Sequence, residues 1–167
     1  MAVTATGTMK ITIEWAYNNA QTLSTIKDIA SLSHSDAFTA GTSANQIDVV
    51  YRTQVTPTSS TPVDLNLKAL ADVFGTTIDF QTVRALFFQN NSSTATEKVL
   101  IGPLGESSPF ITPWNDDADA GNTVGPGGSF AISSPIDGFD QGGGMLRIST
   151  SVSGGVEVDL VLLGVKT

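Results

Sequence analysis

The stretch IDFQTVRALFFQNNSS, Ile78–Ser93, decides the fold class of this 167-residue chain. From Val83 to Phe88 its apolar residues fall at odd and even positions alike, so both faces of an extended segment are apolar. A strand of that kind lies in the middle of a sheet and is covered on both sides. The polar run Asn90–Ser93 then favours a turn. We therefore predict a central, buried strand that ends in a surface turn.

Alternating apolar and polar residues predict further strands on both sides of this one. In residues 9–15, MKITIEW, the four apolar side chains share one face, which is typical of a half-buried strand. The same alternation recurs in residues 47–55, 63–67, 146–152 and 156–165. Glycines at 154 and 155 favour a tight turn between the last two segments. We expect these two to pair as a C-terminal hairpin.

One segment shows a helical period instead. Leu67, Leu70, Ala71 and Phe74 stand at i, i+3, i+4 and i+7, and Gly75 follows as a helix stop. Residues 22–32 fit either a short helix or a strand broken in its middle. The sequence thus predicts an all-β antiparallel sandwich, jelly-roll-like, with one short helix near residues 67–74. Residues 1–8 are expected to form a flexible N-terminal arm, and residues 9–167 a single domain.

Composition excludes several classes of function. The chain has no cysteine, so thiolate chemistry and disulfides are absent. Its net charge is −8, from 8 basic and 16 acidic residues, which argues against binding to a phosphate backbone. Neither a signal peptide nor an apolar run long enough for a membrane is found. We predict no nucleic-acid partner and no membrane partner.

His34 is the one histidine, and it stands in LSHSD between two serines. A catalytic triad assembles in space rather than in sequence, and the chain lacks the G-x-S-x-G motif of a nucleophile elbow. A histidine in a polar loop is therefore the preferred interpretation. We predict no catalytic residue and no cofactor.

An acidic loop begins at Asn115 and contains Asp116, Asp117 and Asp119. Such carboxylates are the weak candidates for a calcium site, because this hard cation prefers oxygen ligands. An EF-hand counted from Asn115 requires glycine at position six and glutamate at position twelve, where this chain has alanine and proline. A solvated acidic loop without metal is the favoured alternative.

Trp114 comes just before this loop and follows a proline. Exposed aromatic residues are favoured anchors in protein and sugar interfaces. Trp114, Asn115 and Asp116 are therefore the candidates for an interaction site. The competing interpretation places Trp114 at a strand end, where its ring caps the core.

The segment from Asp64 to Ser93, DLNLKALADVFGTTIDFQTVRALFFQNNSS, resembles small virion-associated proteins of tailed bacteriophages and prophages. The resemblance implies a non-enzymatic structural protein located in the virion. Capsid decoration is the role it favours, with the major capsid or another virion protein as partner and a homotrimer as oligomer. It transfers no functional residue. The alternative is a carbohydrate-binding jelly-roll module in which Trp114, Tyr51 and the acidic loop form a sugar site, with or without calcium.

Overall fold

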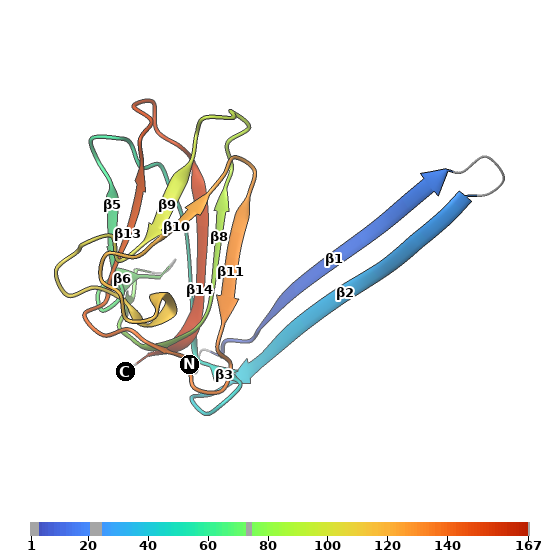
Figure 1. Ribbon diagram of the computed structural model, residues 1–167. Coiled ribbons are helices and arrows are strands. Elements are labelled where there is room, and N and C mark those ends of the chain that lie inside the picture. The colour runs from blue at the N-terminus through green and yellow to red at the C-terminus, as the bar shows by residue number, and fades with distance from the viewer. Residues whose placement is uncertain (1–3, 21–24, 73–74, 167) are drawn as a thin grey trace.

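The computed structural model describes residues 4–20, 25–72 and 75–166, and it consists of a β-sandwich with a long β-hairpin projecting from it (Figure 1). The hairpin is formed by β1 (Gly7–Ala20) and β2 (Thr25–Ala40), and every residue of β1 pairs with β2 between Thr25 and Phe38. We call this hairpin the arm. The short strand β3 (Gln46–Ile47) runs parallel to the end of β2 and joins the arm to the sandwich.

Two antiparallel sheets make the sandwich. One has the order β11-β8-β14-β4, with the short β12 also paired to β8, and the other has the order β10-β9-β13-β5. These two strand orders are those of a jelly roll, in which most connections cross from one sheet to the other, and the antiparallel sandwich confirms the predicted fold class. The strands are β4 (Val49–Val55), β5 (Val63–Asn66), β8 (Phe80–Asn90), β9 (Val99–Gly102), β10 (Asn122–Val124), β11 (Ser129–Ser133), β12 (Phe139–Asp140), β13 (Met145–Thr150) and β14 (Val158–Lys166).

The core lies between these sheets and is built from alternate residues of their strands. Its side chains are aliphatic or aromatic and fully buried, as the removal of apolar surface from water requires. They include Phe80, Leu86, Phe88, Ile101, Phe110, Leu146, Ile148, Leu160 and Leu162.

The prediction of a central strand at Ile78–Ser93 is confirmed by β8. This strand pairs with β14 on one side and with β11 and β12 on the other. Its register shifts opposite Gly164, at a β-bulge that increases the local twist. The turn that follows is anchored by Asn90, whose buried amide donates to the carbonyl oxygens of Glu97 at 2.8 Å and Val124 at 3.2 Å.

The predicted helix near residues 67–74 is wrong wherever the structure describes that segment. Leu67 begins a turn, and Leu70–Ala71 form strand β6, which pairs with β7 (Thr77–Ile78). Leu67 and Leu70 are both buried because a tight turn, rather than a helical turn, brings them to the same side. The predicted position at Phe74 lies outside the described residues.

The predicted C-terminal hairpin is also wrong. β13 pairs with β5 and β9, whereas β14 pairs with β4 and β8, so the two strands belong to opposite sheets. The segment between them crosses from one sheet to the other, and the Val156 amide is bonded to the carbonyl of Pro57. Glycines at a turn are equally compatible with a hairpin within one sheet and with a connection that crosses to the other sheet.

Two N-terminal predictions have mixed outcomes. Residues 9–15 do form an alternating strand, but it belongs to the arm and its apolar face is not buried in the sandwich. For residues 22–32, the strand alternative is confirmed from Thr25 onward, but the predicted break at Asp28 is wrong, because β2 runs through Asp28 and pairs it with Tyr17. The first three residues lie outside the described part. β1 begins at Gly7, which lies within residues 1–8, the segment predicted to be flexible. The flexibility of that segment stays a prediction.

Candidate interaction surface

One face of the arm carries an apolar stripe, whose root end at Met9 packs against the sandwich, and His34 and Asp36 of β2 share that face. Because directly opposed residues of a β-ladder share a face, the register of β1 and β2 places these side chains together. Leu32 is 66% exposed, Ile13 57% and Trp15 43%. We call this set the inner stripe: Met9, Ile11, Ile13, Trp15, Ala30 and Leu32.

The opposite face of the arm is mainly polar. It presents Lys10, Thr12 and Glu14 from β1 opposite serines of β2, and Thr12 lies 3.3 Å from Ser33 between their hydroxyl oxygens. Ile29 is the large apolar residue described on this face, and it is 69% exposed. The arm is therefore amphipathic, with an apolar side and a polar side.

The root of the arm is fastened to the five-stranded sheet by a small second core. Phe38, Ile47 and Ala85 are buried there, and Met9 and Leu163 pack against them. The Ser133 hydroxyl on β11 donates to the Asp36 carboxylate of β2. Gly7 allows this close approach, because a Cβ at that position would lie 3.1 Å from Leu163. The arm thus leaves the sandwich at a fixed point.

Beyond the root, the outward side of the five-stranded sheet is apolar over adjacent strands. The strand registers place its apolar residues in two neighbouring rows across the sheet: Val50, Leu163 and Ala85 form one row, and Val161, Phe87 and Ala131 form the next. Val50 is 40% exposed, and Phe87, Val161 and Leu163 are half-buried. We call the set the sheet face: Val50, Ala85, Phe87, Ala131, Val161 and Leu163. A cleft of about 270 Å³ separates its inner end from Thr8–Lys10 of the arm.

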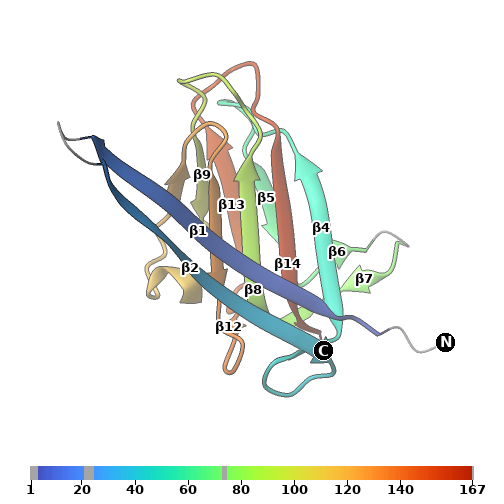
Figure 2. The ribbon, with the colours of Figure 1, turned by 90° about the vertical axis from the view of Figure 1, so that its right-hand side faces the viewer.

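The inner stripe and the sheet face form the two sides of an open wedge. In Figure 2 the arm passes in front of β8 and β14, and Figure 1 shows it standing away from them toward its tip. The narrow end of the wedge is closed at the root, where Met9 of the arm and Leu163 of the sheet both pack against the buried Phe38, Ile47 and Ala85. Contiguous exposed apolar surface of this kind is typical of sites that bind a protein, a membrane or a ligand.

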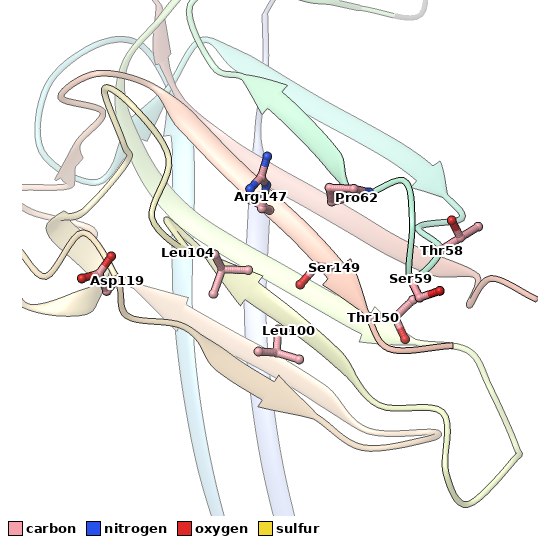
Figure 3. A pocket seen from close by; sticks show the side chains of 9 residues that line it. All are labelled: Thr58, Ser59, Pro62, Leu100, Leu104, Asp119, Arg147, Ser149 and Thr150. Carbon is pink, nitrogen blue, oxygen red and sulfur yellow. The ribbon is translucent and has the colours of Figure 1, made fainter. Parts of the chain in front are cut away.

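A separate polar hollow of about 400 Å³ lies on the outward side of the other sheet (Figure 3). Its charged centre is Arg147, which donates from Nε to Asp64 at 2.7 Å and also pairs with Glu106. These hydrogen bonds lower the pKa of the Asp64 carboxyl, although partial burial opposes the shift. The bond to Asp64 likewise raises the pKa of the Arg147 guanidinium. With two carboxylates beside it, Arg147 is neutralised and is not available to bind an anion.

The interpretation of Trp114 as an exposed anchor is wrong. Its side chain is 7% exposed and packs edge-on against Phe110, with ring centroids 5.9 Å apart. The competing interpretation is right that the ring packs on the core, but a 3-10 turn, η1 (Thr112–Trp114), carries it there rather than a strand end. Tyr51 is buried on β4, so neither aromatic ring offers a stacking surface to a sugar.

The acidic loop is exposed and folds on its own backbone. Asn115 and Asp116 adopt left-handed backbone angles, which Asn and Asp tolerate better than most residues. The Asp117 carboxylate accepts from the Asp119 amide at 2.9 Å. Within the described residues, no three His, Asp or Glu side chains are grouped so that they could hold a metal ion. Asn115 and Asp116 remain predicted interaction residues.

His34 lies on strand β2 rather than in a loop, on the same face as the inner stripe. Its Nε2 atom is 3.2 Å from the Asp36 carboxylate, and the ring is largely exposed. Sequence reasoning missed the arm and the sheet face altogether. The alternation in residues 9–15 was the available signal, but it does not reveal what covers the apolar side.

Comparison with protein-family models and with curated proteins gives no match. Over the described residues, no helix is long and apolar enough to cross a membrane.

Proposed function

We propose that this chain is a non-enzymatic structural protein of a phage virion, with capsid decoration as its role. The observation that carries the proposal is the arm. An isolated two-stranded hairpin is marginally stable in water, and this one also exposes large apolar side chains. An element of that kind gains stability when a protein partner covers it. The arm is therefore best explained as an assembly element.

The polar groups that the structure brings together support a binding role over a chemical one. Arg147 is held between two carboxylates, Asn90 braces a turn, and Asp36 fastens the root of the arm. Each of these clusters serves the fold. His34, the single histidine, stands on the arm beside the residues of the inner stripe.

The virion setting rests on two further supports. The segment Asp64–Ser93 resembles small phage virion proteins, and jelly rolls recur in viral capsid domains. Fold analogy alone does not assign a function. A protein that binds the assembled shell would stabilise it by mass action. We propose the major capsid protein as the partner and a homotrimer as the bound form.

The test is to compare purified phage particles with and without this protein. Decorated particles should withstand higher temperature and stronger chelation before they release DNA, and adding the purified protein back should restore that resistance. Equal resistance of the two kinds of particle, or failure of the protein to bind them, would overturn the proposal.

A further inference from the structure

We infer that the wedge is filled by a second copy of this chain, so that the inner stripe of one copy packs on the sheet face of the next. The inference rests on the proposed function, in which the arm is the assembly element, and it names the partner of that arm. It also predicts self-association of the purified chain when no other virion protein is present.

The first argument is continuity with a contact that already exists within one chain. Met9 is the first member of the inner stripe, and it packs against the buried cluster of Phe38, Ile47 and Ala85, against which Leu163 of the sheet face also packs. Ile11, Ile13 and Trp15 continue the same stripe on the same side of the arm. Phe87 and Val161 continue the sheet face in the next row of the ladder. The two surfaces thus have matching chemistry where they meet and beyond that point.

The second argument is geometric. The arm diverges from its own sandwich, so the outer members of the stripe are held away from the sheet face of the same chain (Figure 1). The root fixes this direction through the second core and the bond from Ser133 to Asp36. Another copy carries an identical sheet face without that restraint, and it can therefore complete the contact that the first copy cannot.

The third argument is area. The exposed part of the inner stripe runs along β1 from Ile11 to Trp15, which is five residues, with Ala30 and Leu32 opposite on β2. At about 3.4 Å per residue, and with two strands about 10 Å wide together, this part presents roughly 170 Å² on one face. Two copies that exchange arms would cover four such areas, or about 680 Å², which is the size of a weak contact that dissociates on dilution.

Exchange of arms also closes the assembly. The arm of each copy packs on the sheet face of another copy, and its own sheet face binds one arm. The exchange is reciprocal in a dimer and head-to-tail in a ring. A ring of three would give the trimer of the proposed function. In either case the stripe and the sheet face are both covered, and neither is left free to recruit further copies into a filament.

The experiment measures the mass of the purified full-length chain by light scattering and sedimentation over a dilution series. The wild type should associate to at least twice the mass of one chain. The double variant Ile13→Thr/Leu32→Thr removes apolar surface from the stripe and places threonine, a β-branched residue that favours strands, at both positions. It should dissociate at a concentration of the order of 100-fold higher.

Ile29→Thr is the matched control, because it makes the same kind of change on the opposite face of the same arm. It should leave the dissociation constant within about threefold of the wild type, since rim and surface changes contribute little. Thermal unfolding of each variant verifies that the sandwich is intact.

A wild-type chain that stays monomeric would overturn the inference, as would a double variant that associates as tightly as the Ile29→Thr control. A monomer that still binds phage particles would overturn the inference and leave the proposed function standing. A self-associating chain that responds to the variants as expected would support the inference, even if it failed to bind particles.

Discussion

Replacing Asn90 by alanine should lower the free energy of unfolding by about 3 kcal/mol. The side chain is fully buried at the end of β8, where its amide donates to the carbonyls of Glu97 and Val124. Its oxygen also accepts from the Ser92 amide at 3.0 Å. Three hydrogen bonds at about 1 kcal/mol each give the estimate, and groups left buried without partners would raise it.

Denaturant and thermal unfolding measure this loss directly. For a chain of this length, about 3 kcal/mol corresponds to a fall in Tm of roughly 6–12 °C. Asn91→Ala is the control, since that neighbouring side chain bonds to Asp159 in an exposed position. It should cost less than about 0.5 kcal/mol. Equal midpoints for Asn90→Ala and the wild type, or equal losses for the two variants, would refute the view that the buried amide braces this turn.

Three further predictions address the polar hollow, a close backbone approach and the arm. Arg147→Met should cost about 0.5–1 kcal/mol at neutral pH, because the pair with Asp64 is partly exposed. The pKa of Asp64 is lowered in the folded protein, so this stabilisation is present above the ordinary carboxyl pKa and is lost as pH falls through the folded-state pKa. The urea midpoints of wild type and variant should therefore converge in acid. A difference in midpoint that is the same at neutral and at acid pH would contradict this. Gly143→Ala should destabilise by about 1–3 kcal/mol, since a Cβ there would overlap a backbone carbonyl, whereas Gly154→Ala, with open space around it, should unfold like the wild type. Dilution that separates the copies should shift the fluorescence emission of Trp15 to longer wavelength, and the shift should vanish in Trp15→Phe; a shift that persists would mean that Trp15 is not the residue that becomes exposed.

The sandwich was accessible from the sequence because period-two alternation reports strands directly. The double-sided apolar pattern from Val83 to Phe88 also identified the central position of β8. Its outward side, however, is covered only in part. Ala85 is buried by the root of the arm, whereas Phe87 is half-buried. A pattern of apolar residues shows which faces need cover, but it does not show whether the same chain supplies it.

The wrong predictions (the C-terminal hairpin, the short helix and the exposed Trp114) arose because a local pattern does not show which distant residues a segment contacts. Glycines after β13 indicated a reversal of the chain, but a reversal is compatible with pairing in one sheet or with crossing to the other. Leu67 and Leu70 have helical spacing, yet their burial depends on strands that lie far away in sequence, since the Leu67 amide is bonded to the carbonyl of Gly144. The burial of Trp114 likewise depends on distant residues, because it belongs to the main core together with side chains of β8, β13 and β14. Local patterns do not contain these long-range contacts.

The central claim is that the arm of one copy lies on the sheet face of another, and cross-linking tests it most directly. The natural chain has no cysteine, so introduced thiols are the only ones that react. One preparation carries Ile13→Cys and the other Val161→Cys. After mixing and treatment with a short bifunctional thiol reagent, the account predicts a covalent pair made of one chain of each kind. Ile29→Cys in place of Ile13→Cys should give little product. A yield of the mixed pair no higher than that of the Ile29→Cys control would contradict the account.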